Sequence, residues 1–318
     1  MKRSAVVAIG ECMVELSRAS DGRFSLAFGG DTFNTAVYVA RLGIPIAYAT
    51  RLGDDPYSAG IVALGQEEGV DTSLIVQVPG RNAGLYLIET AANGERSFHY
   101  WRDRAPAREL FDTPQSAAAV VAAMQSARLV YFSGITLSLY ADAALERFWQ
   151  ALAEARAAGA TIAFDGNFRP RGWDGGSPAG FERARATYRR FLSLVDIALP
   201  SIDDEAKLWG DGSAEDCFER LQRLGVRDIV LKCAEHGAIV STGNGHRYEQ
   251  THVPVPAVVA AVDTTAAGDS FNAAYLASHL KGRAAPDAAA LGHRLAAVVV
   301  SHRGAIVPPS VTAAVSSG

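Results

Sequence analysis

The sequence predicts an α/β fold in which a mostly parallel central sheet is covered by helices on both faces and carries a small antiparallel lid. Short apolar runs alternate with longer amphipathic segments along the chain, a pattern typical of a parallel sheet between two helical layers. Hydrophobic residues make up 49% of the 318 residues, which is ample for a large core. Two segments interrupt the alternation with hairpin-like turn signals.

The expected strands are continuous apolar runs, as befits strands that are buried on both faces. They comprise residues 5–10, 46–52, 129–134, 161–166, 196–200 and 228–232. Helical spacing of apolar residues predicts helices at residues 32–43, 57–69, 114–126, 142–159, 180–194, 213–224, 266–282 and 285–302. Several of these helices end at a glycine suited to a left-handed cap, namely Gly43, Gly159, Gly225 and Gly282. The terminal VTAAVSSG is expected to fray.

Two segments, at about 11–30 and 83–106, are expected to form the lid. Asp-Gly and Asn-Gly pairs stand there between short runs with partial alternation, which indicates hairpins. We therefore expect one domain over residues 1–318, with the lid inserted in it. Because exposed strands tend to pair with another chain, we also expect a homodimer or a higher homo-oligomer that forms through the lid.

Composition excludes several classes of partner. The net charge is −4 and the pI about 6.0, without basic runs, so neither nucleic acid nor an anionic membrane surface is an expected partner. The first apolar run is broken by Gly10 and Glu11, too early for a signal peptide, and no apolar stretch reaches the roughly 18 residues of a membrane span. Three cysteines without metal or disulfide spacing are interpreted as buried free thiols, namely Cys12, Cys217 and Cys233. These features predict a cytoplasmic protein.

The stretch DTTAAGDSFN, residues 263–272, carries the strongest chemical signal. At the start of the predicted helix, the backbone amides of Ala266, Ala267 and Gly268 would be free to bind an anion with help from the helix dipole. Asp269 places a carboxylate in the same turn, which a purely phosphate-binding loop would not need. An ordinary capped helix, with an aspartate that complements the dipole, explains these ten residues equally well.

A second stretch, GGDTFNTAVYVARLG at residues 29–43, again places glycine and polar side chains at the start of a helix. Gly30 precedes the helix, and Asp31 and Asn34 lie in its first turn. A plain glycine turn with an aspartate cap is the alternative interpretation. The common short motifs, among them the GxxxxGK[ST] phosphate loop and the GxGxxG dinucleotide fingerprint after the first strand, are absent.

Together the two stretches resemble the signatures of the ribokinase-like, or phosphofructokinase-B, family of carbohydrate kinases. The resemblance covers about residues 5–308 and implies a ribokinase-like three-layer α/β/α fold and ATP-dependent phosphorylation of a sugar hydroxyl. The stretches GECMVELS, GERSFHYWR, FDGNFRPRGW and HRGAIVP further resemble the kinases of 2-keto-3-deoxygluconate within this family. This implies that the small-molecule substrates are that sugar acid, phosphorylated at its terminal 6-hydroxyl, and ATP, which reacts as its Mg²⁺ complex.

The resemblance also implies roles for individual residues. Asp269 would be the base that removes the proton of the attacking sugar hydroxyl, and the amides of residues 266–268 would stabilise charge on the transferred phosphoryl group. An arginine pair suits a carboxylate, because it can form bidentate hydrogen bonds. The residues assigned to the sugar acid are Gly30, Asp31, Asn34, Tyr86, Tyr100, Arg102 and Arg169. Core packing of the tyrosines and a solvated Arg102 are the alternatives, and Glu11 could accept from a sugar hydroxyl or be structural.

The nucleotide is expected near the strand at 228–232 and at the anion-binding turn. The residues implied are Asn167, Lys232, Gly237, Ala266 and Gly268. Asp165 and Asn167 follow a predicted strand, where open α/β sheets place ligands. The family's magnesium-linked acidic element is replaced by PSIDDEAKLW, in which Asp204 or Glu205 could serve, although acidic residues at a helix start also simply complement its dipole.

Three other functions remain open at the level of the sequence. A fructokinase or another sugar or sugar-acid kinase of the same family would share both signatures. A sugar-binding protein without activity would retain the fold but would not require Asp269. A nicotinamide-dependent dehydrogenase would share the α/β class, but it would need the glycine fingerprint that is missing here.

Overall fold

A computed structural model describes residues 5–18, 21–90, 96–243, 247–256 and 261–316. Its central sheet has the strand order β13-β12-β11-β10-β9-β8-β1-β4-β5, parallel from β11 to β5 and antiparallel at β12 and β13. The strands are β1 (Val6–Ile9), β4 (Ile46–Gly53), β5 (Ile75–Val78), β8 (Leu129–Ser133), β9 (Thr161–Asp165), β10 (Ile197–Ala198), β11 (Asp228–Lys232), β12 (Ala238–Gly243) and β13 (Tyr248–Val253). The predicted parallel sheet is therefore confirmed.

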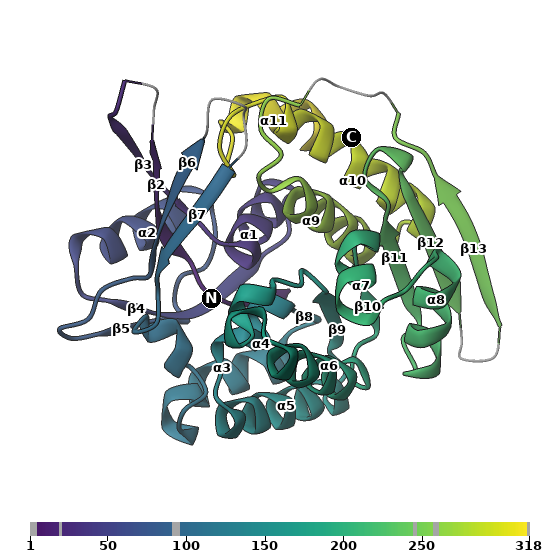
Figure 1. Ribbon diagram of the computed structural model, residues 1–318, viewed down its shortest axis with the longest axis horizontal. Helices are drawn as coiled ribbons and strands as arrows, with labels where there is room; N and C mark the ends of the chain where they lie inside the picture. The colour runs from purple at the N-terminus through teal and green to yellow at the C-terminus, as the bar shows by residue number, and fades with distance from the viewer. Residues whose placement is uncertain (1–4, 19–20, 91–95, 244–246, 257–260, 317–318) are drawn as a thin grey trace.

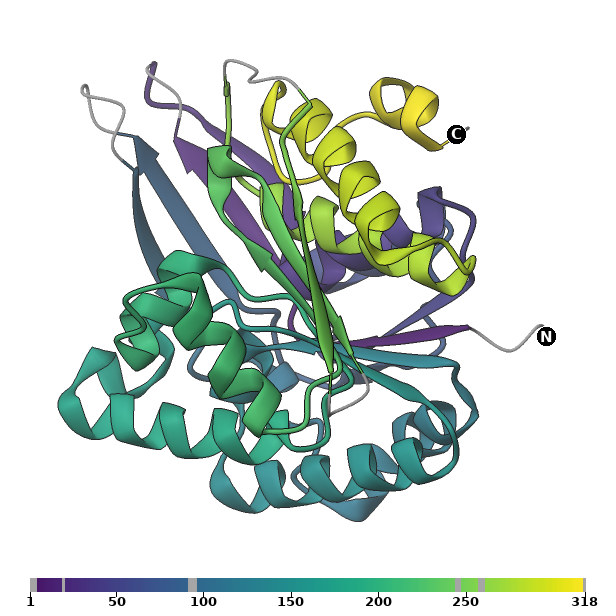
Figure 2. The same ribbon diagram turned by 90° about the vertical axis from the view of Figure 1, so that its right-hand side faces the viewer.

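Helices cover both faces of this sheet, which Figure 2 shows between a lower and an upper helical layer. The helices are α1 (Asp31–Arg41), α2 (Pro56–Glu67), α3 (Pro114–Ser126), α4 (Gly134–Leu139), α5 (Asp142–Ala157), α6 (Pro178–Leu192), α7 (Ile202–Trp209), α8 (Ala214–Arg223), α9 (Ala267–Leu280), α10 (Ala285–Val300) and α11 (Pro309–Ser316). Alternate residues of each strand feed two cores. Val7 and Ile9 of β1 pack with α3, α5 and α6, whereas Val6 and Ala8 pack with α1, α9 and α10. This alternation explains why the strands read as continuous apolar runs.

The lid is a four-stranded sheet that stands apart from the central sheet (Figure 1). Its strands are β2 (Met13–Arg18), β3 (Phe24–Gly29), β6 (Leu85–Thr90) and β7 (Arg96–Trp101), in the order β3-β2-β6-β7. Both predicted hairpins, β2/β3 and β6/β7, are antiparallel, and β2 and β6 join them by parallel pairing. The Asn-Gly turn predicted at residues 93–94 lies outside the described residues.

The elements predicted from apolar runs are all present, with small shifts of their ends. The glycines predicted as caps are left-handed, with φ of 80° at Gly43, 98° at Gly159, 90° at Gly225 and 77° at Gly282. The expected fraying of the terminus is wrong up to Ser316, because α11 begins at Pro309 and packs on α10. Along the described residues, no helix combines the length and the apolar character that a membrane crossing requires.

Candidate active site

A cleft of about 690 Å³ lies between the lid and the carboxyl ends of the central strands. Open α/β sheets bind ligands at this edge. The lid lines the cleft with four side chains, Met13, Tyr86, Phe98 and Tyr100. The opposite wall comes from strand ends and helix starts, with Gly30, Asp31, Asn34, Asp165, Asn167, Arg169, Asp204, Lys232, Gly237, Ala266, Ala267, Gly268 and Asp269 among its residues. The cleft thus gathers most of the residues that the sequence singled out.

The start of α9 forms the floor of the cleft. Ala266 precedes the helix in the left-handed conformation, with φ 60° and ψ 17°, and small side chains keep its surroundings open. The amides of Ala266, Gly268 and Asp269 have no acceptor among the described residues, so they can bind an anion with the helix dipole. The prediction needs a correction at Ala267, whose amide donates to Thr264 O at 3.3 Å.

The turn before α9 is held by the buried carboxylate of Asp263. One carboxylate oxygen, Oδ1, accepts from the amide of Thr265 at 2.9 Å, and Oδ2 accepts from the amide of Gly304 at 3.0 Å. These contacts tie the turn to the segment that follows α10. Since Ala266 carries a Cβ in a backbone conformation that favours glycine, such anchoring explains how the turn keeps its shape.

Asp269 lies half-buried in the first turn of α9, with its carboxylate facing α1. Oδ2 accepts from Asn34 Nδ2 at 2.8 Å, so the two helix starts are joined at this point. Burial raises the pKa of Asp269 to about 8, and the nearby charge of Asp31 adds to the rise, whereas Asn34 and Lys232 oppose it. A carboxyl group that releases and accepts a proton near neutrality is suited to general acid–base chemistry.

The start of α1 faces the same cleft but is more fully engaged. Asp31 accepts from the Thr32 amide at 2.8 Å through Oδ1 and from Asn167 Nδ2 at 2.7 Å through Oδ2. Gly30 permits a close approach to the end of β1, because an added Cβ would lie 2.0 Å from Glu11 O. Asn167 has φ 33°, a left-handed conformation that asparagine tolerates better than most residues.

Three polar side chains form a network behind the anion-binding amides. Lys232 Nζ, at the end of β11, donates to Asp165 Oδ1 at 3.2 Å and to Asn272 Oδ1 at 3.0 Å. Asn272 Nδ2 donates to Asp165 Oδ2 at 2.8 Å and lies 3.2 Å from Tyr131 Oη. Burial raises the pKa of Asp165, and the charge of Lys232 opposes the rise. The network holds a lysine ammonium in the wall of the cleft.

The lid contributes two tyrosines to the other side of the cleft. Tyr86 donates to Glu15, and its ring lies 5.9 Å from that of Tyr100. Arg171 approaches from the body of the protein, with its guanidinium 5.2 Å from the centre of the Tyr100 ring and Nη1 donating to Phe98 O at 2.9 Å. Gly237, directly before β12, has φ 91°, and a Cβ there would lie 2.3 Å from Val253 O.

Arg169 and Asp204 line the cleft together. Arg169 Nη1 lies 3.0 Å from Asp204 Oδ1 and 2.8 Å from Phe168 O, to which it donates. More than half of the Arg169 side chain is exposed, at 56%, so its remaining donors can reach a ligand. The guanidinium of Arg169 also partly neutralises the charge of the Asp204 carboxylate.

Two predicted site residues do not line the cleft. Arg102 forms an ion pair with Glu11 at the base of the lid, where the two side chains are 17% and 2% exposed. This pairing leaves Arg102 behind Tyr100, with its guanidinium 5.9 Å from the ring centre. Burial and the ion pair are the physical reason, because a buried carboxylate such as Glu11 requires a partner of opposite charge.

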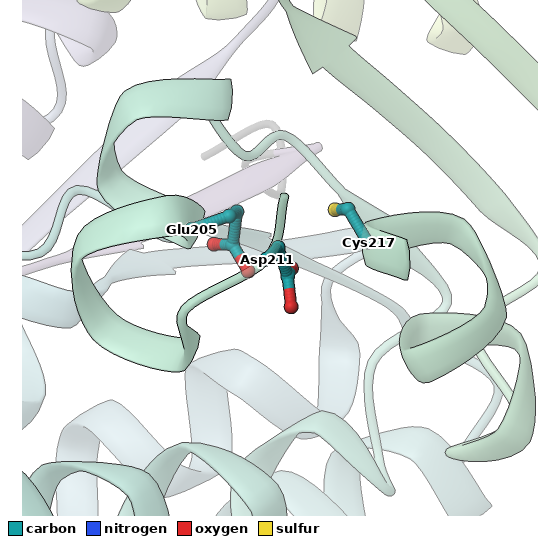
Figure 3. Close-up of side chains that lie close together, drawn as sticks. All are labelled: Glu205, Asp211 and Cys217. Atoms are coloured by element: carbon teal, nitrogen blue, oxygen red, sulfur yellow. The ribbon is translucent and has the colours of Figure 1, made fainter. Parts of the chain in front are cut away.

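Glu205, the second residue outside the cleft, points away from it beneath α7. Figure 3 shows Glu205, Asp211 and Cys217 close together. The atoms that could bind a metal, one carboxylate oxygen of each acid and the sulfur of Cys217, lie within 4.8 Å of one another. Arg220 Nη2 contacts both carboxylates and is 2.6 Å from Glu205 Oε2. Burial raises the pKa of Glu205 to about 7 despite this guanidinium. The cluster is thus organised around an arginine that joins α7 to α8, and the prediction that Glu205 faces a metal in the cleft is not supported.

His293 is among the cleft residues that were not predicted from the sequence. His293 of α10 lines the cleft and is 7% exposed, and its Nε2 is buried without a hydrogen-bond partner among the described residues. Its ring packs on Phe271 at 5.0 Å, and burial lowers its pKa. A single histidine within the apolar segment LGHRLAAVVV was the available signal, because a buried polar group calls for a partner.

Comparison with known proteins identifies a family and close relatives of this chain. Residues 3–312 match the model of the pfkB family of carbohydrate kinases. A 2-dehydro-3-deoxygluconokinase of Escherichia coli K12 is 41% identical over 307 residues, covering 95% of this chain and 97% of the relative. A 2-dehydro-3-deoxygluconokinase of Dickeya dadantii is 39% identical over 312 residues, covering 97% of this chain and 98% of the relative.

Solved structures share the fold. A crystal structure of an Escherichia coli protein in complex with ATP and Mg²⁺ superposes with a TM-score of 0.81 at 24% identity, covering 95% of this chain and 94% of the other. The family match spans nearly the whole chain and includes both helix starts that form the cleft. The chain belongs to the pfkB family of carbohydrate kinases.

Proposed function

We propose that this kinase transfers the γ-phosphoryl group of ATP to the 6-hydroxyl of 2-keto-3-deoxy-D-gluconate (2-dehydro-3-deoxygluconate), giving 2-keto-3-deoxy-6-phosphogluconate. The observation that carries the proposal is that Asp269 lies in the same turn as backbone amides that have no acceptor among the described residues, inside a cleft lined by the lid. Two relatives with that named activity, at 41% and 39% identity, support the choice of substrate.

The residues of the cleft account for each atom that moves. As the sugar oxygen forms a bond to the γ-phosphorus, its proton passes to the Asp269 carboxylate. The bond between the γ-phosphorus and the bridging oxygen breaks, and its electron pair stays on the β-phosphate of ADP. A positioned base contributes ~10²–10⁴ to such a rate. The free amides of Ala266 and Gly268 would stabilise the negative charge on the phosphoryl oxygens.

The sugar acid fits the half of the cleft next to the lid and α1. Gly30, Asp31 and Asn34 offer polar groups beside Asp269, and Tyr86 and Tyr100 close that side. Of the arginine pair assigned to the carboxylate, Arg169 is the member that lines the cleft. To contact the substrate carboxylate, the guanidinium of Arg102 must move past Tyr100 when the substrate binds.

ATP fits the other half, between the α9 turn and the end of β11. The proposed contacts are Asn167, Lys232, Gly237, Ala266 and Gly268. The buried Nε2 of His293, which has no partner among the described residues, suits a polar edge of the adenine base. Mg²⁺ would be held mainly by phosphate oxygens and water, with Asp204 as the protein carboxylate that borders the cleft. Bound there, Mg²⁺ supplies charge neutralisation of the phosphates. ATP as co-substrate and free thiols fit the proposed cytoplasmic location.

The outer face of the lid suits a second copy of this chain. Phe24 and Leu26 of β3 are 49% and 51% exposed, and Trp101 of β7 is 60% exposed. The register places all three on the side opposite to Tyr86 and Tyr100. Large exposed apolar side chains on one sheet face mark an interaction surface. We therefore propose a homodimer through the lid, and expect Leu26→Glu to reduce the mass measured by light scattering from a dimer to a monomer, whereas an unchanged mass would contradict it.

The proposed substrate is tested by measuring transfer from γ-labelled ATP to a panel of sugars. We expect the highest kcat/KM with 2-keto-3-deoxygluconate and a value at least ~100-fold lower with fructose, because polar groups arranged to bind a carboxylate stay unpaired when the substrate lacks one. Equal or higher kcat/KM with fructose would identify a fructokinase instead. Binding of sugar without turnover of ATP would identify a sugar-binding protein.

A further inference from the structure

Lys232 occupies a place in the cleft that a nucleotide contact alone would not require. A Cβ added at Gly268 would lie 3.7 Å from Lys232 Nζ, so the ammonium lies close to Gly268, whose amide has no acceptor among the described residues. The Lys232 side chain is only 14% exposed. Its charge is also close enough to Asp269 to oppose the rise of that carboxyl pKa. A cation therefore lies close to both the anion-binding amides and the proposed base.

The ammonium has one donor left for a ligand. It carries three N–H groups, of which one points to Asp165 Oδ1 at 3.2 Å and one to Asn272 Oδ1 at 3.0 Å. Among the described residues, no further acceptor lies within hydrogen-bond distance of Lys232 Nζ. Since Lys232 lines the cleft, the third donor can reach a group bound there.

Asp165 and Asn272 fix the direction of that donor. Asn272 Nδ2 donates to Asp165 Oδ2 at 2.8 Å, so the two acceptors of Lys232 are also bonded to each other. Asn272 lies on α9 one turn after Asp269, and Asp165 ends β9. The network therefore links the base, the amides and the ammonium through a single helix start.

We propose that Lys232 is a catalytic residue of phosphoryl transfer, whose ammonium stabilises the charge on the transferred group beside the Gly268 amide, with Asp165 and Asn272 as its positioning residues. The proposal rests on the proposed kinase function. Lys232 neither gains nor loses a covalent bond or a proton. Charge stabilisation of this kind acts most strongly where water is excluded and the donor is already oriented.

The central test compares Lys232→Met with the wild type at saturating ATP and sugar acid. Removal of one preorganised donor lowers kcat by ~10²–10³, and we expect that loss with the KM for the sugar acid changed by less than about threefold. Lys207→Met, on an exposed position of α7, is the matched control and should keep full activity. A kcat within threefold of the wild type, or a loss confined to the KM for ATP, would overturn the proposal.

Two further variants separate chemistry from folding. Lys232→Met leaves Asp165 buried without its cation, so the double variant Lys232→Met/Asp165→Asn removes both charges. We expect it to fold and to keep the ~10²-fold loss of kcat; recovery of wild-type kcat would contradict the proposal. In Lys232→Ala, added ethylammonium should restore part of kcat in a saturable way, while tetramethylammonium, which lacks N–H donors, should not. Equal effects of the two cations would also count against it.

The assays distinguish this proposal from the proposed substrate. If the wild type prefers another sugar, the substrate assignment fails, and the Lys232 variants are then measured with that sugar. A wild type that transfers phosphate to no sugar would contradict both proposals.

Discussion

Two helix starts lie side by side in one wall of the cleft, and they carry similar residues in different environments. Both α1 and α9 carry an aspartate in the first turn, Asp31 and Asp269. Asp31 is bonded on both oxygens, to the Thr32 amide and to Asn167. Among the described residues, Asn34 alone donates to the carboxylate of Asp269, and the amides of Ala266, Gly268 and Asp269 have no acceptor. The comparison indicates that satisfied groups hold the site in shape, whereas unsatisfied groups are available for chemistry.

The largest expected difference lies in catalysis. Asp269→Asn should lower kcat by ~10²–10⁴, since it removes the proposed base, whereas Asp31→Asn should lower kcat by no more than about tenfold. Steady-state rates of both variants at saturating substrates make the comparison. Equal losses of kcat in the two variants would contradict the different roles that we assign to Asp269 and Asp31.

A second effect concerns the contact that joins the two helices. In the wild type, the hydrogen bond from Asn34 Nδ2 lowers the pKa of Asp269. Asn34→Leu removes this bond, so the pKa of Asp269 should rise. We expect kcat/KM to fall about tenfold at pH 7 and less at pH 9, where the carboxyl ionises even without Asn34. A loss that is the same at both pH values would assign Asn34 to substrate binding alone.

The pH profile offers a third comparison. Only ionised Asp269 accepts a proton, and its pKa is raised to about 8, so kcat/KM should rise with pH and level off above about 8. The negative charge of Asp31 contributes to the raised pKa of Asp269. In Asp31→Asn, kcat/KM should therefore begin to rise at a lower pH than in the wild type. The measurement is kcat/KM from pH 5.5 to 9.5. A flat wild-type profile over that range would contradict a base with this pKa.

Much of this site could be predicted because parallel strands deliver their ends to one edge. Asp165, Asn167 and Lys232 each follow a continuous apolar run, so their neighbourhood was visible in the sequence. Arg102 and Glu205 were misplaced because their partners, Glu11 and Arg220, are fixed only by the tertiary fold. No local pattern reveals a long-range ion pair.

Secondary structure, too, was predicted only where a local sequence pattern indicates it. Strands buried on both faces, such as β8, were predicted, and so were helices that end at glycine. β13, the edge strand, was missed because it is polar and largely exposed, and its neighbour β12 because only its first three residues form an apolar run. α4 was missed because it is a short helix whose capping box, Ser133 with Thr136, lies inside an apolar stretch.

A smaller effect is expected on stability. The folded state holds the Asp269 proton more tightly than the unfolded chain, whose carboxyl groups titrate near pH 4. The stability contributed by that proton is complete below about pH 4 and is lost as pH rises to about 8. Asp269→Asn should therefore have a higher Tm than the wild type at pH 8, and the same Tm at pH 4. A lower Tm at pH 8 would show that the carboxylate stabilises the turn.

The smallest effect is expected at the cap of α9. Ala266 adopts φ 60°, which costs a non-glycine residue roughly 1 kcal/mol. Ala266→Gly relieves that cost but gives the unfolded chain more freedom, so the two terms offset to within about 1 kcal/mol. Unfolding by urea should show this near-neutrality, and kcat should stay within twofold. A large loss of kcat would mean that the methyl group itself orders the turn.

The most direct test of the central claim is the rate of a single turnover of phosphoryl transfer from ATP to 2-keto-3-deoxygluconate, measured for the wild type and Asp269→Asn with both substrates bound. We expect transfer by the wild type and a rate at least ~10²-fold lower in the variant. Equal rates in the two proteins would contradict the assignment of Asp269 as the base.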